Sequence, residues 1–247
     1  MTKFKTLALT TLLALSTTLS ADFLRVEGGV GAWMAEPAGQ MNYNSTTKAD
    51  LADNFGYETS ANMYAWVYFK HFIPIVPNVR LEYTGLGYEG TSKNLIFNKN
   101  TLPDGTSTTT NLTELDGILY YNILDNTAWM TVDLGLDIKS INFKYQDNTS
   151  SDLSETVTLP LAYLRLRVEI PATNIGLEAD AKYISTGSST VSDIRAKVDY
   201  TLDFIPVIQP GLEIGYRIHQ IKLDESDFDL KADMDFSGAY LGLMVRF

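Results

Sequence analysis

The chain has 247 residues and a formal net charge of -11; 45% of its residues are hydrophobic and 20% are charged. This composition is typical of an ordered protein and excludes wholesale disorder. The chain holds no cysteine, which excludes a disulfide-stapled fold, thiolate metal sites and thiol catalysis. The acidic balance argues against nucleic acid as a partner, because nucleic-acid binding needs a basic surface.

The first 21 residues predict a secretory signal peptide. Lys3 and Lys5 give a basic start, "TLALTTLLALS" follows as an apolar run, and "LSA" ends the segment with small residues. Cleavage is expected after Ala21, with Ser20 as the alternative, which leaves a mature domain over 22–247 with a net charge of -13. A membrane anchor is the other interpretation, but the apolar run is too short to span a bilayer.

Ten later segments alternate apolar and polar residues with a period of two, the pattern of half-buried β-strands. The clearest is "MTVDLGLDIK", in which Met130, Leu134 and Ile138 oppose Asp133 and Lys139. The segments are 23–33, 62–70, 79–88, 114–123, 130–139, 162–170, 175–183, 193–202, 212–219 and 238–247. Their apolar faces hold no charged residue, whereas their polar faces hold eleven basic and twelve acidic side chains. Because a slip of one residue exchanges the two faces, the register is strongly fixed.

Two folds can use such strands: a soluble sandwich with a dry core, or a closed barrel with its apolar face towards lipid. The connections alternate in length, with 34–59, 91–111 and 142–154 long and 72–78, 124–128 and 171–174 short. Long outer loops and short periplasmic turns are typical of outer-membrane barrels. The sequence therefore predicts an all-β fold, an antiparallel up-and-down transmembrane β-barrel of ten strands, or of eight if two segments fail to pair.

Four stretches of the mature chain carry a resemblance to a known family: "ILYYNILDN", "LPLAYLRLRVEIP", "LEIGYR" and "LKADMDFSGAYLGLMVRF". Together with the signal peptide, they resemble an uncharacterised family of proteobacterial outer-membrane β-barrel proteins over nearly the whole mature chain. The resemblance implies a barrel in the outer membrane of a Gram-negative bacterium, in contact with lipid and lipopolysaccharide, and implies no activity. The alternate residues Leu241, Leu243, Val245 and Phe247 resemble the C-terminal signal by which outer-membrane proteins reach the barrel assembly machinery.

Charged residues of both signs face the interior of the predicted barrel. The candidates for a lumen charge network are Arg25, Glu27, Arg80, Glu82, Asp133, Arg165, Arg167, Asp180, Arg195, Glu213 and Arg217. Small barrels are filled by side chains, so these charges favour a lumen that is bridged by ion pairs. A narrow polar conduit is the alternative interpretation of the same residues.

His219 is a weak candidate for catalysis, with Asp193 as its expected hairpin neighbour. A histidine and an aspartate at a barrel lip resemble the arrangement in outer-membrane proteases. Acid–base or nucleophilic chemistry needs further groups within hydrogen-bond reach, and the sequence offers no second acid pair and no well-placed serine. The His-x-Ser of outer-membrane lipid A deacylases is also absent, because Gln220 and Ile221 follow His219. A structural histidine is therefore the favoured interpretation.

Acidic residues crowd the stretch "LDESDFDLKADMDF" in the predicted external loop 222–235. Hard cations such as calcium prefer several carboxylate oxygens, which makes Asp224, Asp227 and Asp229 candidate ligands. The spacing lacks the glycine and terminal glutamate of an EF-hand loop, and most acidic runs are solvated faces. Bridging of lipopolysaccharide phosphates through divalent cations is a related hypothesis.

The predicted function is that of a non-enzymatic integral outer-membrane barrel with a structural, surface-interaction or small-solute passage role. No cofactor is expected, and a monomer is predicted because a closed barrel has no edge strand to pair. The alternatives are a narrow, porin-like channel and, less favoured, a hydrolase at the barrel lip that uses His219.

Overall fold

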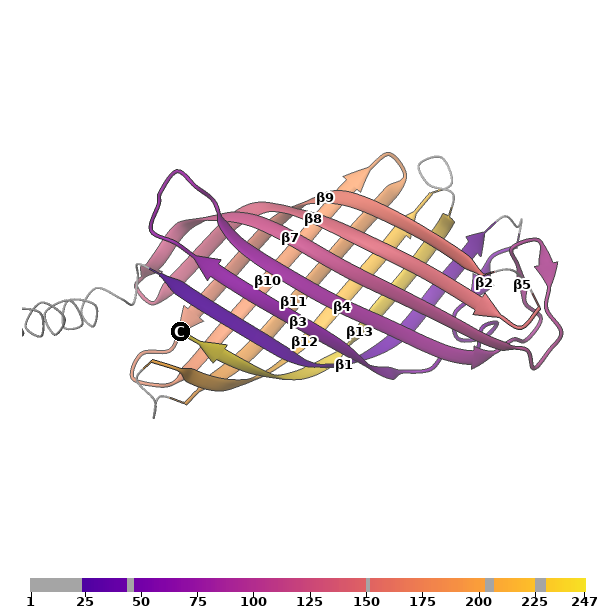
Figure 1. Ribbon diagram of the computed structural model, residues 1–247, viewed down its shortest axis with the longest axis horizontal. Helices are drawn as coiled ribbons and strands as arrows, with labels where there is room; N and C mark the ends of the chain where they lie inside the picture. The colour runs from indigo at the N-terminus through magenta and orange to yellow at the C-terminus, as the bar shows by residue number, and fades with distance from the viewer. Residues whose placement is uncertain (1–23, 44–46, 150–151, 203–206, 225–229) are drawn as a thin grey trace, which may run out of the picture.

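The computed structural model describes residues 24–247 apart from 44–46, 150–151, 203–206 and 225–229, so the predicted signal peptide at 1–21 lies outside the described residues. Ten long strands form a barrel (Figure 1). They are β1 (Arg25–Tyr43), β3 (Ser60–Lys70), β4 (Asn78–Thr91), β7 (Ser107–Thr127), β8 (Met130–Asp147), β9 (Leu153–Glu169), β10 (Ile175–Thr186), β11 (Ser189–Thr201), β12 (Gln209–Leu223) and β13 (Leu230–Arg246). Three two-residue strands, β2 (Ala49–Asp50), β5 (Ile96–Phe97) and β6 (Asn100–Thr101), lie in the connections. In the described part of the chain, no helix is long and apolar enough to cross a membrane.

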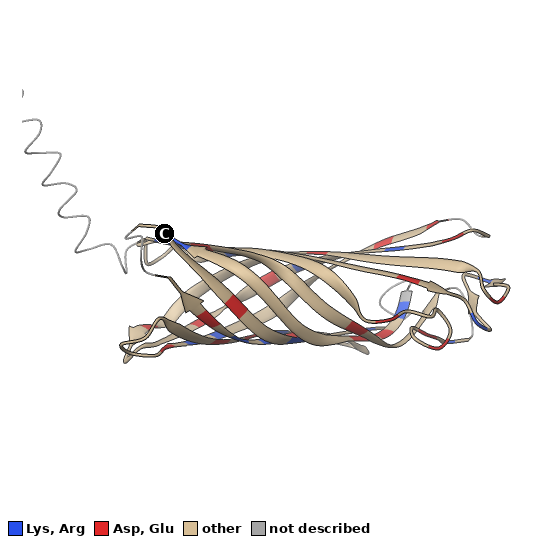
Figure 2. Cartoon of the chain, turned by 90° about the horizontal axis from the view of Figure 1, so that it is seen from below, with Lys and Arg blue, Asp and Glu red and all other residues tan. Residues whose placement is uncertain are grey.

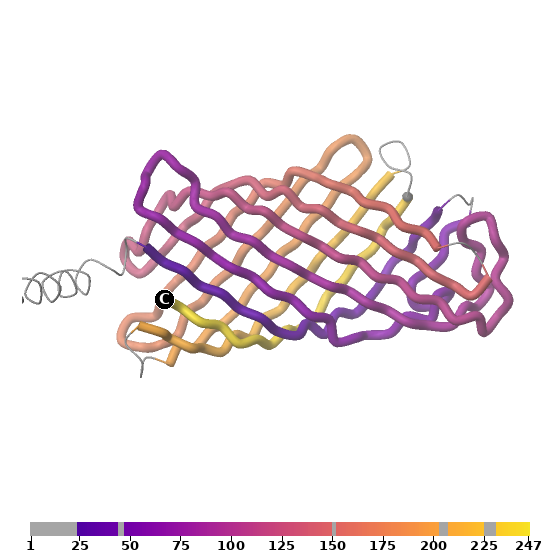
Figure 3. Tube along the Cα trace, in the orientation of Figure 1, coloured from indigo at the N-terminus to yellow at the C-terminus, as the bar shows by residue number. Residues whose placement is uncertain are grey.

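Antiparallel pairing follows chain order around the sheet and then closes it. Each long strand pairs with the long strands before and after it, and β13 returns to pair with β1. The closing ladder runs from the pair Glu27 and Arg246 to the pair Tyr43 and Leu230, so the start of β1 and the end of β13 lie side by side (Figure 3). The predicted ten-stranded antiparallel barrel is confirmed, and the eight-stranded and sandwich alternatives are wrong.

An apolar belt surrounds the barrel near the end where β1 begins and β13 finishes, here termed the terminal end. In β8, Leu136 and Ile138 point outwards and are 64% and 52% exposed, whereas Asp133 and Lys139 point inwards and are fully buried. The predicted register is confirmed in this strand and in the other nine. The belt takes about ten residues of a strand, 130–139 in β8, and a transmembrane strand needs about 9–11 residues.

Beyond the belt the polarity of the two faces inverts. The opposite end of the barrel, here termed the loop end, holds β2 and β5 (Figure 1). In β8 the inward side chains change there from Lys139 to Ile141 and Phe143, while Asn142 and Lys144 point outwards. The same change brings buried apolar side chains into four further strands, at Leu86, Leu112, Ile221 and Met234. The strands pass through the inversion without losing their pairing.

The strands consequently reach further than the sequence predicts. The expected loops 34–59, 91–111 and 142–154 are wrong at their edges, because β1 continues to Tyr43, β7 begins at Ser107, and β8 and β9 leave only 148–152 between them. The expected loop 222–235 also shortens, to 224–229. Beyond the belt the outward face is polar, so the alternation of apolar and polar residues reverses its phase there and does not continue the pattern of the segment 130–139.

Apolar side chains fill the barrel at the loop end and form what is here termed the outer core. Strands contribute Trp33, Leu86, Leu112, Ile141, Phe143, Tyr145, Leu159, Ile221 and Phe236, and the connections contribute Leu51, Phe55, Leu95, Phe97 and Leu102, all buried. Phe97 packs edge-on against Tyr145 and Phe55, with ring centroids 4.7 and 5.3 Å apart. The connections between β1 and β3 and between β4 and β7 therefore fold into the mouth of the barrel.

Candidate functional site

The predicted lumen charges lie inside the apolar belt, where charged residues recur along the strands (Figure 2). Arg25 is half-buried, and the other ten are at most 8% exposed: Glu27, Arg80, Glu82, Asp133, Arg165, Arg167, Asp180, Arg195, Glu213 and Arg217. Further buried charges join them, among them Lys139, Lys182, Glu114, Asp116, Glu178 and Asp199. This set is here termed the charged layer.

At the terminal end, the charged layer joins the first and last strands to the rest of the barrel. Arg167 donates to both oxygens of Asp199 at 2.7 and 3.0 Å, and Arg246 donates to the same carboxylate at 2.7 Å. Glu27 in turn pairs with Arg246 at 3.3 Å and with Arg25. The bonds tie β1, β9, β11 and β13 together, so closure of the barrel rests on side chains as well as on the β1–β13 ladder.

Half-way along the belt, Arg165 joins three strands and stacks on a fourth. Its guanidinium donates to Asp133 in β8 and to Glu178 in β10, each at 2.7 Å. It also lies 4.7 Å from the ring centre of Tyr68 in β3. Arginine suits this position because its planar guanidinium has several N–H donors and can bond two carboxylates at once.

Nearer the loop end, ion pairs cross the lumen from one wall to the other. Lys182 in β10 lies 2.6 Å from Glu82 in β4 and 3.1 Å from Asp116 in β7. Arg195 in β11 binds Asp180 at 2.7 Å and also Glu82. Because β4 is not a sheet neighbour of β10 or β11, these bonds bridge the interior and obstruct it.

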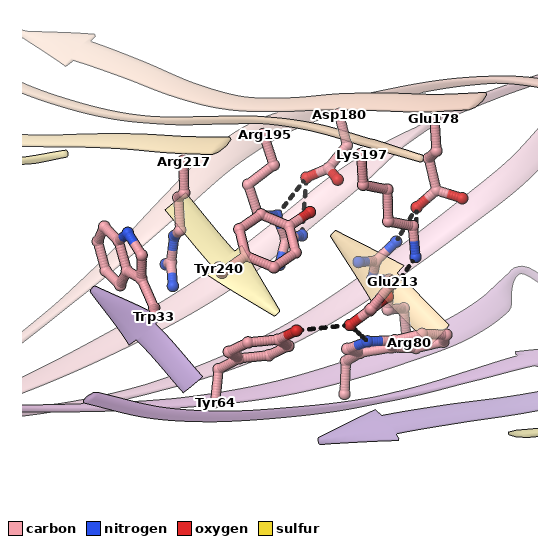
Figure 4. A pocket seen from close by; sticks show the side chains of 11 residues that line it. Trp33, Tyr64, Arg80, Glu178, Asp180, Arg195, Lys197, Glu213, Arg217 and Tyr240 are labelled. Atoms are coloured by element: carbon pink, nitrogen blue, oxygen red, sulfur yellow. Dashed lines mark hydrogen bonds and ion pairs between the residues drawn. The ribbon is translucent and has the colours of Figure 1, made fainter. Parts of the chain in front are cut away.

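A small cavity remains in the centre of the charged layer (Figure 4). Its free volume is about 10 Å³, room for about one water molecule. Glu213 accepts hydrogen bonds from Tyr64 at 2.7 Å and from the Trp66 indole at 3.0 Å, and Lys197 lies 2.8 Å from its other oxygen. The groups that line the cavity are thus bound to one another, and the lumen is filled by side chains at this level.

His219 and Asp193 lie opposite each other in the β11–β12 ladder but bind different partners. The two ring nitrogens of His219 lie 3.0 Å from the carbonyl oxygen of Ser192 and 2.7 Å from the carboxylate of Glu114. Both ring nitrogens therefore have hydrogen-bond partners within the barrel, and these contacts fix the orientation of the buried imidazole. Asp193 accepts two bonds from Arg217, at 2.9 and 2.7 Å. The geometry favours a structural role for both candidates.

The acidic candidates for calcium form no site within the described residues. Asp224 lies 3.6 Å from the ammonium of Lys231, and Asp227 and Asp229 lie outside the described residues. Asp235 lies in β13, not in the expected loop. Across the described ranges, no three acidic or histidine side chains gather in a way that could hold a metal ion. Calcium binding stays a prediction.

The C-terminal residues of the expected assembly signal lie on the outward face of the last strand. Leu241, Leu243 and Phe247 are 61%, 63% and 57% exposed, and Val245 is half-buried. Their alternate placement on the outward face agrees with the register that the sequence predicts. Their recognition by the assembly machinery stays a prediction.

Aromatic side chains of the lumen escaped the sequence analysis. The Trp66 ring lies between two cations, 4.5 Å from the Lys197 ammonium and 5.5 Å from the Arg80 guanidinium. Trp33 stacks in the same way under Arg217, at 4.5 Å. The available signal was their position, because both tryptophans occupy inward places in a barrel whose other strands carry inward cations, which can pack on their rings.

Comparisons with known proteins return structures but no sequence family. No protein-family model matches the chain, and no curated protein matches it. The family resemblance seen in the sequence therefore stays a prediction.

Three similar solved structures are remote from this chain in sequence. The outer membrane protease OmpT from Escherichia coli is 8% identical, with 92% of this chain and 97% of that chain covered and a TM-score of 0.47. The translocator domain of autotransporter NalP from Neisseria meningitidis is 12% identical, with coverage of 99% and 95% and a TM-score of 0.44. The attachment invasion locus protein Ail of Yersinia pestis, in complex with the heparin analogue sucrose octasulfate, is 10% identical, with coverage of 91% and 99% and a TM-score of 0.41. The fold given above rests on the strand pairing of this chain itself.

Proposed function

We propose that the protein is an integral barrel of the Gram-negative outer membrane with a closed lumen, a non-enzymatic anchor that presents its loop end at the cell surface. The apolar belt supports the membrane location, because its height matches a bilayer and its outward face carries no charge. The short connection 128–129 at the terminal end and the folded connections at the loop end match periplasmic turns and external loops.

Two layers of side chains that fill the lumen, one after the other along the barrel axis, support the proposal that the lumen is closed. Within the belt, the cross-lumen ion pairs leave a central cavity of about 10 Å³. At the loop end, the outer core fills the mouth, with Phe55 and Phe97 fully buried in it. Conduction needs a continuous path of water or polar ligands, and an ion would have to displace both layers. A closed scaffold is therefore favoured over a narrow channel.

The loop end supports a role at the cell surface. In β8 the residues 140–147 continue the strand beyond the belt, which at ~3.3 Å per residue and a tilt of ~40° extends the barrel by ~20 Å. This section is polar outside and apolar inside, the arrangement of a water-soluble barrel. We infer that it is a rigid platform for surface interaction, and that the protein functions as a monomer because no strand edge of the barrel is left open.

Ion conductance across a planar lipid bilayer tests the closed lumen. The purified protein, inserted with its β-sheet content verified, is expected to give no single-channel steps at moderate voltage, while a general porin in the same bilayer gives them. Steady steps of reproducible size from the wild-type protein would overturn the closed scaffold and favour the narrow channel.

A further inference from the structure

A gap opens in the wall of the barrel just beyond the apolar belt. The β3–β4 ladder ends at the pair Met63 and Gly85, although β4 continues to Thr91. Beyond this pair, the connection from β1 to β3 takes the place of a strand: Asn54 accepts a backbone hydrogen bond from Lys93. The wall at this level is therefore built from a connection and leaves a recess.

The recess has a volume of about 440 Å³, within the range of small-ligand sites. Its lining includes Glu58, Ser60, Gly87, Glu89, Thr109 and Asn111. Gly87 lies on the outward face of β4, directly opposite Asn111 of β7. A Cβ added at Gly87 would meet a single neighbour, the Asn111 side-chain oxygen at 3.2 Å. The missing side chain at Gly87 thus creates part of the space.

The lining offers carboxylates, an amide and hydroxyls, and none of its described residues is basic. Within the described part of the chain, the side chains of Glu58, Glu89, Thr109 and Asn111 make no hydrogen bond. Acceptor-rich carboxylates beside an amide and hydroxyls suit a ligand with many hydroxyl groups. Phosphate is disfavoured, because two carboxylates would repel it without a cation to balance them.

The position of the recess suggests that such a ligand is the head group of a lipid. Towards the belt, the outward face of β4 continues from Gly87 through Tyr83 to Leu81, and Met63 of β3 pairs with Gly85. Met63 and Leu81 are 60% and 55% exposed and belong to the apolar belt. A molecule with its acyl chains against the belt would place its head group at the recess. We propose that the recess binds the uncharged sugar portion of a membrane glycolipid. This inference rests on the proposed outer-membrane location.

Binding to defined glycolipids tests the inference, with the protein in phosphocholine nanodiscs. The probes are a diacylglycerol that carries an uncharged disaccharide and the same diacylglycerol without the sugar. Wild-type protein is expected to bind the glycolipid about tenfold more tightly than the diacylglycerol, a difference of about 1.4 kcal/mol. Gly87→Val, which fills the recess with a side chain suited to a strand, is expected to remove that preference. Equal affinity of the wild type for both probes would overturn the inference.

Gly117→Val is the matched control, because Gly117 also lies on an outward face but in the apolar belt, where a Cβ would meet only one backbone oxygen at 4.0 Å. It is expected to bind like the wild type. Asn111→Ala provides a second test that alters no glycine, and it should weaken binding of the glycolipid without changing binding of the diacylglycerol. An unchanged preference in both Gly87→Val and Asn111→Ala would contradict the site.

The free disaccharide is the third probe, added as a competitor. Competition at the concentration at which the intact glycolipid competes would show a site for free sugar and overturn the glycolipid assignment. The outcome is separate from conductance: a silent wild-type protein without sugar preference contradicts this inference alone, whereas single-channel steps contradict the closed lumen alone.

Discussion

The half of the barrel inside the apolar belt and the half beyond it share ten strands and one register, yet their polarity is opposite. Within the belt, Leu136 and its neighbours face lipid while Asp133 and Lys139 are buried inside. Beyond it, Lys144 faces water while Phe143 is buried inside. The comparison teaches that the medium outside decides which face of each strand is apolar, and that the interior then takes the opposite character.

A physical reason links the two faces. If the interior of the belt were also apolar, segments such as 130–139 would become runs of about ten apolar residues, which aggregate before they fold. Polar inward residues interrupt those runs, and their charged side chains then pair with one another inside the barrel. Beyond the belt the outward residues are polar, so the interior can be apolar without creating such a run. Buried ion pairs are not needed for stability as such, because apolar replacements of similar volume often match them.

The largest effect is expected when the charged layer loses one cation. Arg165→Met leaves the carboxylates of Asp133 and Glu178, both within 2.7 Å of the guanidinium, buried with less compensation. The free energy of unfolding should fall by about 3–5 kcal/mol, measured by urea titration in phospholipid vesicles. Lys144→Met, on the outer surface beyond the belt, should change it by less than about 0.5 kcal/mol. A loss below about 1 kcal/mol for Arg165→Met would mean that water fills the lumen.

A second prediction tests the position of the inversion along a single outward face. Leu136 and Asn142 both point outwards from β8, six residues apart. Leu136→Arg should lower the free energy of unfolding by about 2–4 kcal/mol, because it places a charge in lipid. Asn142→Arg should stay within about 0.5 kcal/mol, because it adds a charge to a face in water. Urea titrations of the two variants in the same vesicles give the comparison, and equal losses would show that the belt reaches Asn142.

The sequence predicted the number and orientation of the strands correctly, but it did not predict where the strands end. Alternation over segments such as 130–139 was enough for the strand number, the pairing order and the direction of each side chain, because lipid forbids charge on one face. The predicted strand stopped at Lys139 because the next inward residue, Ile141, is apolar. In the sequence, a reversal of the apolar and polar faces cannot be told apart from the end of a strand. Only pairing with neighbours, as between Phe143 and Leu112, shows that the strand continues.

The residues of the charged layer could be predicted from the sequence, but the pairs that they form could not. Inward placement followed from the register, so each of the eleven charges could be named. The partner of each charge could not, because pairs such as Lys182 and Glu82 join strands that are distant in the sheet. The neighbour of His219 shows the same limit: register places Asp193 beside it, but the imidazole reaches Glu114, 105 residues away in the chain.

The smallest expected effect concerns the outer core, whose connections can open without unfolding the barrel. Phe97 is fully buried between Tyr145 and Phe55, whereas its neighbour Ile96 in β5 is 36% exposed. Phe97→Leu removes part of the aromatic packing and should destabilise the docked connection by about 1 kcal/mol. Local opening of residues 92–106 should then increase about fivefold, measured as the rate of limited proteolysis in vesicles. Ile96→Leu is the matched control and should be cleaved at the wild-type rate. Unchanged cleavage of Phe97→Leu would show that the connection is held by its backbone hydrogen bonds, such as that from Asn98 to Tyr43 at the end of β1. The apolar packing that distinguishes this end of the barrel from the charged layer would then not be what holds it.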